Sequence, residues 1–410
     1  MQQIRRKHLM EKINNQSILI IFSGRALKKT ADQFFPFVVN RNFFYLTGLE
    51  EANMALVMIR SNNQIKELIF KEIRSPERAL WDGELLTQEE VTNISKIEEV
   101  RNIDTLETFI KQITSSDRSA IYGKLTDLHL DLEANDSDSL AYKFSSKIKV
   151  LHPYLNINNI HQEIAALRMI KSSDEIDNIK KAIKITNEAL NNVLKNIKSG
   201  IYEYEVVADY NYILGKHNVE PSFDTIAASG HNATVLHYVK NNSVIPKNSL
   251  MLFDLGVNYS NYASDISRTY PVDGKFTPRQ KEFYELVLKA NKETIKMLKP
   301  GVTWKEFNDY AKDILSSGLI KMGLIKEKEE ISKYYYHSIG HFLGLDVHDV
   351  GVYNVALQAG MVVTVEPGLY ISEEDIGIRI EDDILITENG SINLSIDIPK
   401  EIDEIEKLMK

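Results

Sequence analysis

Residues 250–270 read Leu-Met-Leu-Phe-Asp-Leu-Gly-Val-Asn-Tyr-Ser-Asn-Tyr-Ala-Ser-Asp-Ile-Ser-Arg-Thr-Tyr. An apolar run containing one aspartate is followed by a polar turn at 258–261 and by a second extended run, which predicts a β-hairpin. If the turn is centred between Tyr259 and Ser260, residues whose numbers sum to 519 lie opposite each other. We therefore expect Asp254 to face Asp265 directly, on one side of the hairpin.

Two carboxylates placed opposite each other are an unusual feature of a sheet. Like charges in this arrangement destabilise the pairing, and burial increases the cost. A divalent cation between them turns the repulsion into attraction. Because Leu252, Phe253 and Leu255 surround Asp254, we expect a buried metal site; two solvated aspartates beside a turn are the alternative.

A second acidic pair occurs further along the chain. The apolar run Met361–Val365 ends at Glu366, and Ile376–Ile386 predicts a returning strand. Side chains alternate along a strand, so Arg379 and Glu381 share the face opposite the isoleucines. This arrangement repeats the aspartate hairpin, although a surface ion pair between Arg379 and Glu381 is an alternative interpretation.

Similar helices precede both acidic segments. Ser172 with Glu175, and Thr277 with Gln280, form capping boxes that begin long amphipathic helices. Each helix is followed by a similar string at an offset of 101 residues: Lys-Ser-Gly-Ile at 198–201 and Lys-Pro-Gly-Val at 299–302. We interpret residues 170–400 as an internal duplication, helix–helix–hairpin twice, with a site where the halves meet. Chance similarity between two amphipathic helices is the alternative.

The N-terminal part of the chain alternates short strands with helices and predicts an α/β domain. Strands are expected at Ser17–Phe22, Met54–Arg60, Glu67–Phe70 and Ser119–Tyr122, and a helix at Asp104–Thr114. No glycine-rich phosphate loop occurs. The predicted fold class is thus α/β (α+β), with a smaller N-terminal domain at 1–160 and a duplicated C-terminal domain at 161–410.

Composition excludes several classes of function. The 410 residues contain no cysteine, so thiol nucleophiles, disulfides and cysteine-ligated metals are absent. With 49 Lys+Arg against 58 Asp+Glu, the net charge is -9, and no basic footprint for nucleic acid is present. No signal peptide or membrane span is visible in the sequence. We expect a cytoplasmic chain with no nucleic-acid or membrane partner.

Histidines add nitrogen ligands to the acidic pairs. The chain has ten histidines, and three of them, His337, His341 and His348, fall within twelve residues. A ligand set of carboxylates with few imidazoles suits Mn²⁺, Co²⁺, Fe²⁺ or Zn²⁺ in a two-metal arrangement.

Four motifs, in this order along the chain, resemble the proline-peptidase branch of the pita-bread metallopeptidases, family M24, which contains Xaa-Pro aminopeptidase (aminopeptidase P) and prolidase. They are Ser-Asp-Ile-Ser-Arg-Thr-Tyr at 264–270, His-Ser-Ile-Gly-His-Phe-Leu-Gly-Leu-Asp-Val-His-Asp-Val-Gly at 337–351, Val-Glu-Pro-Gly-Leu-Tyr at 365–370 and Gly-Ile-Arg-Ile-Glu-Asp-Asp at 377–383. The segments 37–48 and 79–83 are similar to the accessory domain of aminopeptidase P.

The resemblance implies a pita-bread fold and a dinuclear metal site, most often manganese. The five matching ligand positions are Asp254, Asp265, His341, Glu366 and Glu381, with Asp265 and Glu381 in the bridging places. His237, His337 and His348 match substrate-flanking histidines, and Arg379 matches an arginine of the proline site. One departure is Gly340: aminopeptidase P usually has serine at this position, and the glycine is closer to the prolidase pattern.

The resemblance also implies a reaction. Two divalent ions acidify a shared water and polarise the scissile carbonyl, and we expect Glu366 to act as the general base. His348 and His237 are the expected stabilisers of the oxyanion, with His337 beside the proline. We expect an exopeptidase that releases an N-terminal residue from short peptides with proline second. Prolidase and a metal-free peptide-binding module are the alternatives.

The family further implies a homodimer or homotetramer. In such an assembly the N-terminal domain, through Trp81, would narrow the entrance of a neighbouring subunit.

Overall fold

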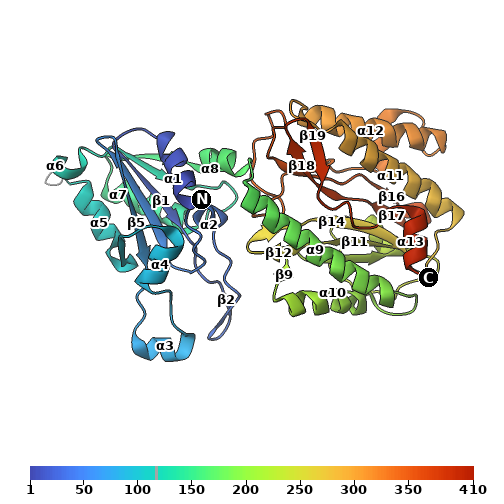
Figure 1. The fold of residues 1–410 in the computed structure, drawn as a ribbon, viewed down its shortest axis with the longest axis horizontal. Helices are drawn as coiled ribbons and strands as arrows, with labels where there is room; N and C mark the ends of the chain where they lie inside the picture. The colour runs from blue at the N-terminus through green and yellow to red at the C-terminus, as the bar shows by residue number, and fades with distance from the viewer. Residues whose placement is uncertain (116–118) are drawn as a thin grey trace. The chain divides into compact units, whose positions relative to one another are not determined.

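The computed structural model describes residues 1–115 and 119–410. The chain forms two compact units, Met1–Arg168 and Met169–Lys410 (Figure 1). Among the described residues, no helix is both long enough and apolar enough to cross a membrane.

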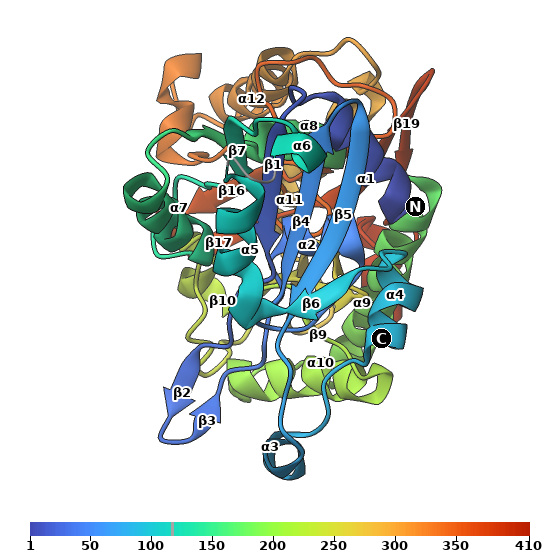
Figure 2. The ribbon, with the colours of Figure 1, turned by 90° about the vertical axis from the view of Figure 1, so that its left-hand side faces the viewer.

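The first unit is built on a six-stranded mixed sheet with the order β6-β5-β4-β1-β7-β8 (Figure 2). Strands β1, β4 and β5 pair antiparallel, whereas β7 and β8 extend the sheet in parallel. The strands are β1 (Ser17–Phe22), β4 (Ala55–Ser61), β5 (Gln64–Lys71), β6 (Val100–Asn102), β7 (Asp127–Leu130) and β8 (Asn156–Asn159), with a separate hairpin of β2 (Lys28–Thr30) and β3 (Gln33–Phe34). The helices are α1 (Gln2–Glu11), α2 (Arg41–Thr47), α3 (Pro76–Asp82), α4 (Gln88–Ser95), α5 (Leu106–Ile113), α6 (Ser119–Tyr122), α7 (Leu140–Leu151) and α8 (His161–Arg168).

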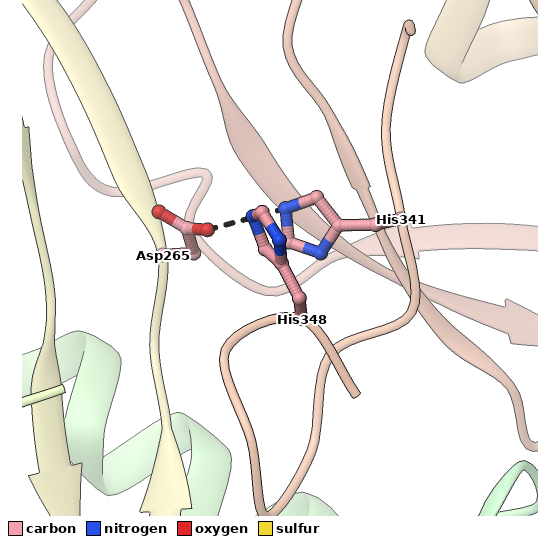
Figure 3. Close-up of side chains that lie close together, drawn as sticks. All are labelled: Asp265, His341 and His348. Carbon is pink, nitrogen blue, oxygen red and sulfur yellow. Dashed lines mark ion pairs between the residues drawn. The ribbon is translucent and has the colours of Figure 1, made fainter. Parts of the chain in front are cut away.

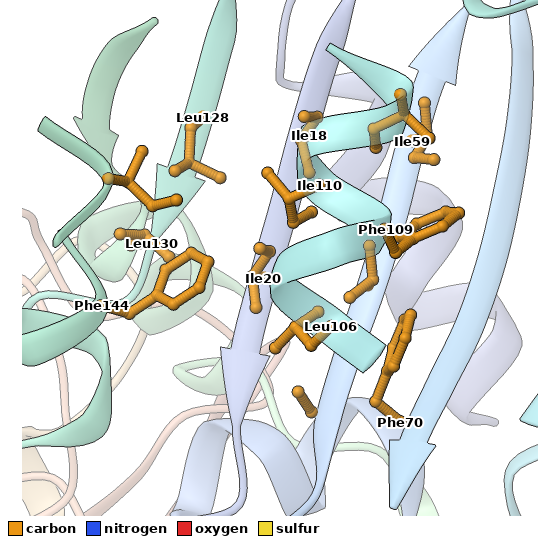
Figure 4. Close-up of a cluster of buried hydrophobic side chains, with 14 of the residues drawn as sticks. Ile18, Ile20, Ile59, Phe70, Leu106, Phe109, Ile110, Leu128, Leu130 and Phe144 are labelled. Carbon is orange, nitrogen blue, oxygen red and sulfur yellow. The ribbon is translucent and has the colours of Figure 1, made fainter. Parts of the chain in front are cut away.

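Helix α5 covers one face of this sheet. Leu106 and Ile110 point from the helix toward Ile20 and Ile18 of β1, whereas the ring of Phe109 lies 5.5 Å from that of Phe70 of β5 (Figure 4). These residues belong to one buried cluster that contains side chains of β4, β5, β7 and α7 as well. The helix predicted at Asp104–Thr114 is therefore confirmed as α5, which follows a 3₁₀ turn at Ile103–Thr105.

One predicted strand of this unit is wrong. Residues Ser119–Tyr122 form the short helix α6. The place in the sheet beside β1 belongs to β7, five residues beyond α6, where Leu128 and Leu130 are buried and pair with β1.

The second unit contains two helix pairs, the three-stranded sheets β10-β11-β14, β13-β12-β9 and β15-β18-β19, and the two-stranded sheet β16-β17. The helices are α9 (Ser173–Asn196), α10 (Glu203–His217), α11 (Pro278–Met297), α12 (Trp304–Lys321) and α13 (Ile402–Leu408). The strands are β9 (Glu220–Pro221), β10 (Ile226–Ser229), β11 (Leu250–Leu255), β12 (Val257–Tyr259), β13 (Tyr262–Ala263), β14 (Ile266–Pro271), β15 (Val362–Val365), β16 (Gly368–Ile371), β17 (Ile376–Arg379), β18 (Asp382–Thr387) and β19 (Gly390–Asn393).

The internal duplication is confirmed. The first half runs α9, α10 and the sheet β10-β11-β14, and the second runs α11, α12 and the sheet β15-β18-β19. Helices α10 and α12 begin at equivalent positions: Thr303 and Glu306 form a capping box, and the side chain of Glu205 accepts the N–H of Tyr202 in the same way. Both predicted boxes at the starts of α9 and α11 are present too.

The two halves are joined along β14. The backbone N–H of Glu381 donates to the carbonyl of Ser267 at 3.0 Å, and the N–H of Arg379 donates to Oγ1 of Thr269 at 3.2 Å. These bonds place the acidic segments of the two halves side by side.

The predicted register of the aspartate hairpin is wrong by two residues. Asp254 lies opposite Ser267, and Leu255 lies opposite Ile266, so paired numbers sum to 521. The turn residues are Ser260 and Asn261, both with positive φ, so the turn is centred one residue later than expected. Asp265 remains on the face of Asp254 but lies diagonal to it, because side-chain direction has a period of two.

Candidate metal centre and active site

All nine predicted site residues line one cavity of about 640 Å³ in the second unit. They are His237, Asp254, Asp265, His337, His341, His348, Glu366, Arg379 and Glu381. Strand ends supply most of them: Asp254 lies in β11, Asp265 directly precedes β14, Glu366 follows β15, and Arg379 and Glu381 flank the break between β17 and β18. The strand predicted at Ile376–Ile386 is thus divided into β17 and β18, and the break between them lies at the site.

Three overlapping groups of side chains could each hold a cation. Within each group the ligand atoms lie no more than 4.8 Å from one another. The groups are Asp254 with Asp265 and Glu381, His341 with Glu366 and Glu381, and Asp265 with His341 and His348. Asp265, His341 and Glu381 each belong to two groups. Of these three, only the two carboxylates have two oxygens with which one side chain could contact two ions.

His341 is the imidazole at the centre of this cluster. Its Nε2 lies 3.3 Å from Oδ2 of Asp265 and 3.7 Å from Oε1 of Glu366. Figure 3 shows its ring directed at Asp265, with His348 beside it. The two imidazole rings are 4.1 Å apart, close enough for both to reach one bound species.

The buried carboxylates fit a pair of divalent ions. Within the described part of the chain, Oδ1 of Asp265 and Oε1 of Glu381 are buried without a hydrogen-bond partner, an arrangement that is costly for a charged group. Burial and the surrounding acidic groups raise the pKa of both carboxyls well above their ordinary values. Burial also raises the pKa of Glu366 to about 7. Bound cations would satisfy the free oxygens and offset the repulsion.

Arg379 is buried and connects the two halves of the site. Its Nη2 donates to Oδ2 of Asp254 at 2.6 Å, its Nε to Oγ of Ser267 at 2.7 Å and its Nη1 to the hydroxyl of Tyr370 at 2.9 Å. Arg379 does not form the surface ion pair with Glu381 that was the alternative interpretation of the sequence. Its positive charge instead neutralises one aspartate of the cluster.

The two histidines that flank the cluster are neutral near neutral pH. Burial, together with the charge of Arg379, lowers the pKa of His337 to about 3. Partial burial and the neighbouring His341 lower the pKa of His348 to about 4. A neutral imidazole carries one N–H donor and one free nitrogen, so the ring of His348 can donate to an acceptor on a substrate. Nδ1 of His337 lies 2.7 Å from the carbonyl oxygen of Ser338, which can only accept, so the N–H of a neutral His337 is on Nδ1 and its Nε2 is an acceptor. Nε2 of His337 also lies 2.8 Å from the hydroxyl of Tyr370.

Several residues of the cavity were not predicted. Ser267 lies under the acidic cluster, and a correct hairpin register would have found it opposite Asp254. Tyr370 contacts both His337 and Arg379, and it stands in the motif 365–370 from which only Glu366 was assigned. Trp304, Lys305, Asn308 and Tyr353 form another wall of the cavity, and no sequence motif marks them.

The absence of a side chain at Gly340 has a steric cause in this chain. A Cβ at this position would lie 2.1 Å from the carbonyl oxygen of Thr364, so no side chain fits between the two backbones. Close packing beside His341 therefore accounts for glycine at this position in this chain.

Comparison with known proteins gives consistent matches. The model of metallopeptidase family M24 matches residues 177–388, and the aminopeptidase P N-terminal domain matches residues 3–122. The Xaa-Pro aminopeptidase of Haemophilus influenzae is 35% identical over 99% of this chain and 96% of the relative. That of Escherichia coli is 32% identical over 99% of this chain and 97% of the relative.

Solved structures agree with these matches. A candidate aminopeptidase P from Bacillus anthracis superposes with a TM-score of 0.96 at 41% identity, covering 100% of this chain and 97% of that one. Zinc-substituted aminopeptidase P of Escherichia coli in complex with product gives 0.90 at 30% identity with the same coverage. The predicted pita-bread fold is therefore confirmed, and the chain belongs to metallopeptidase family M24, with an aminopeptidase P N-terminal domain ahead of its peptidase domain.

Proposed function

We propose that this chain is an Xaa-Pro aminopeptidase, a metal-dependent exopeptidase that hydrolyses the bond between an N-terminal residue and a following proline. One observation carries the proposal: carboxylates from both halves of the duplicated domain converge in one cavity, and two of them keep buried oxygens free for a cation. The full-length similarity to Xaa-Pro aminopeptidases supports the choice of substrate.

The proposed metal ligands are Asp254, Asp265, His341, Glu366 and Glu381. Asp265 and Glu381 are proposed as the shared ligands, because each belongs to two of the candidate groups and each is a carboxylate with two oxygens. Two divalent ions at this place would supply an acidified water and a Lewis acid for the scissile carbonyl, at a tertiary amide that has no N–H.

Glu366 is proposed to move the proton. Its Oε1 lies beside Nε2 of His341, and its Oε2 lies 3.7 Å from Nδ1 of His337. A carboxylate at the edge of the cluster can accept the proton of the attacking water and donate it to the proline nitrogen. The peptide bond then breaks with a neutral amine as the leaving group.

Histidines and Arg379 are proposed to hold the substrate. His237 and His348 lie on the side of Asp254 and Asp265 and would donate to the oxyanion. His337, joined to Tyr370 and Arg379, would lie along the proline ring. The neutral state of His348 leaves it able to donate one hydrogen bond without adding charge, whereas the N–H of a neutral His337 is directed at the carbonyl of Ser338.

The proposal is tested by measuring the hydrolysis of an Xaa-Pro-Xaa tripeptide and an Xaa-Pro dipeptide in Mn²⁺, with metal content measured in parallel. We expect release of the N-terminal residue from the tripeptide, no cleavage of a matched Xaa-Ala-Xaa control, and loss of activity with a chelator. Cleavage of the dipeptide alone would assign the chain to the prolidases. Absence of any Xaa-Pro cleavage by metal-loaded protein would overturn the proposal and favour the peptide-binding module.

The native metal is proposed to be Mn²⁺. Four carboxylates and one imidazole form a hard ligand set, which suits Mn²⁺ better than metals that prefer thiolates. Co²⁺, Zn²⁺ and Fe²⁺ remain alternatives, and metal analysis of protein purified without added ions distinguishes them.

We also propose a homodimer or homotetramer located in the cytoplasm. Helix α3 supports the oligomer, because Leu80 and Trp81 are 88% and 89% exposed, and apolar side chains exposed together mark an interaction surface. Replacing both by serine should lower the mass measured by light scattering. We also propose, as the sequence predicts, that the boundary between the N-terminal domain and the peptidase domain lies between residues 160 and 161.

A further inference from the structure

Glu203 is a buried carboxylate with no cationic partner among the residues that the structure describes. Its side chain is fully buried at the first residue of α10. Oε1 accepts hydrogen bonds from the N–H and hydroxyl of Ser229, at 2.9 and 2.8 Å, and from Nδ2 of Asn232 at 3.0 Å. Oε2 accepts from the hydroxyl of Tyr238 at 2.8 Å and from the N–H of Ser243 at 3.0 Å. Five donors on one carboxylate can offset much of the cost of burying its charge.

In the sequence, the residues that supply these donors lie on both sides of His237. Ser229 and Asn232 precede it at the end of β10 and in the 3₁₀ helix η3 (Gly230–Thr234), whereas Tyr238 and Ser243 follow it. The N–H of Glu203 also donates to the carbonyl of Ser243 at 3.0 Å. One side chain therefore gathers both ends of the segment 229–243.

His237 itself is held only through this segment. Its ring is exposed and makes no hydrogen bond or ion pair with another residue that the structure describes. Beyond Tyr238, the next anchor is the buried Asn241, which receives the N–H of Ala227 at 2.9 Å and donates to the carbonyl of Thr225 at 2.8 Å. The place of the imidazole in the cavity thus depends on how the backbone around it is fixed.

We propose that Glu203 is the positioning residue for His237, acting from outside the cavity through Tyr238 and Ser243. The inference rests on the proposed function, in which His237 donates to the substrate. A carboxylate is required at this place because it only accepts hydrogen bonds. The amide of a glutamine would turn an NH₂ group toward donors and leave at least one of them unpaired.

The test is a double-mutant cycle on the tripeptide substrate with E203Q, H237A and the double variant. We expect E203Q to lower kcat/KM about 10- to 100-fold, because small displacements of a reacting group have costs of this size. Bound metal should remain stoichiometric, since Glu203 touches no candidate ligand. In H237A, the further change to E203Q should alter kcat/KM by no more than about twofold, whereas independent effects would multiply.

The matched control is E205Q. Glu205 is exposed in the same turn of α10 and accepts only the N–H of Tyr202, at 2.8 Å, so we expect kcat/KM within about twofold of wild type. Y238F removes one of the five donors with little risk to folding, and should reproduce part of the E203Q loss, again only when His237 is present.

The possible outcomes distinguish a failure of the proposed function from a failure of the positioning role of Glu203. Wild-type protein without Xaa-Pro cleavage would overturn the proposed function, and full activity of H237A would overturn the role of His237. Wild-type activity of E203Q beside an impaired H237A would overturn the positioning role alone. The positioning role would also be overturned if the loss of kcat/KM in E203Q multiplied with the loss in H237A. Unchanged activity of Y238F would overturn it as well.

Discussion

At the scale of single residues, the hydroxyl of Ser267 contacts three charged groups of the candidate metal centre. Its hydroxyl accepts from Nε of Arg379 and lies 2.8 Å from Oε2 of Glu381 and 3.1 Å from Oδ1 of Asp254. It is completely buried. One hydroxyl therefore orients ligands from both halves of the domain.

Replacing Ser267 by alanine should weaken metal binding about 10- to 100-fold, the usual cost of removing a group that orients a metal ligand. Arg379 would lose an acceptor, and Glu381 would lose a donor. Calorimetric titration of the metal-free protein with Mn²⁺ measures the effect. Ser391→Ala is the matched control, because this hydroxyl donates to the carbonyl of Ile295 away from the site, and equal affinities of the two variants would contradict the prediction.

Removal of His341 and of His348 should have different results. His341→Ala takes the only imidazole from the group containing Glu366 and Glu381, so we expect loss of bound metal together with loss of activity. His348→Gln should retain both ions and lower kcat about 100-fold, as the removal of an oxyanion donor does.

Metal content and turnover, measured on the same samples, check both variants. A His341→Ala enzyme with full metal and full activity would exclude this histidine as a ligand. Loss of metal from His348→Gln would show that His348 is a ligand.

At the scale of elements, the helical segment η3 and strand β17 approach each other closely. A Cβ on Gly377 would lie 2.0 Å from the carbonyl oxygen of Ala233. Because both partners are backbone, neither can move aside as a side chain would. The close contact fixes the segment that precedes His237 against the strand that carries Arg379.

Gly377→Ala should therefore lower the free energy of unfolding by about 1–3 kcal/mol, the range for overpacking. Chemical denaturation measures the change. Gly390→Ala in β19 is the control, since its added Cβ would meet no atom within 4 Å, and an equally large loss in the control would remove the steric explanation.

The hairpin shows how far sequence reasoning reaches at this scale. Two adjacent turn centres were compatible with the segment 258–261, and the choice of the earlier one placed Asp265 opposite Asp254. The alternation of side chains survives such a shift, which explains why both aspartates were still assigned to one face. Register depends on Ser260 and Asn261 adopting positive φ, a feature that composition favours at asparagine but does not locate.

At the scale of the whole molecule, prediction succeeded where a pattern repeats and failed where contacts are long-range. The offset of 101 residues revealed the duplicated domain, because each half carries its own caps and apolar faces. Strand β7 was missed because a short apolar segment takes its structure from the neighbour it pairs with. The cavity wall formed by Trp304 and Tyr353 brings together α12 and a distant loop, and neither segment has a local signal.

Stability of the first unit should depend on pH through His161. Its Nδ1 lies 2.7 Å from Oδ1 of Asp131, and this hydrogen bond raises the pKa of His161. The folded state therefore favours the protonated ring. The stabilisation is complete below the unfolded pKa of about 6.5 and is lost as the pH rises through the folded pKa.

Amide hydrogen exchange in α8 and β7 measures this contribution. Wild type should be better protected than His161→Gln at a pH of about 5.5, and the gap should shrink at about 8.5. A gap that stays constant or widens with pH would contradict the assignment.

The joint between the halves has a consequence for how the protein matures. The first half supplies Asp254 and Asp265, the second supplies His341, Glu366 and Glu381, and the bond from Glu381 to Ser267 forms only once the halves have docked. Neither half alone carries the complete set of proposed ligands, so binding of both ions requires the two halves to be docked. Full metal affinity should therefore appear only in a chain whose two halves have both been completed.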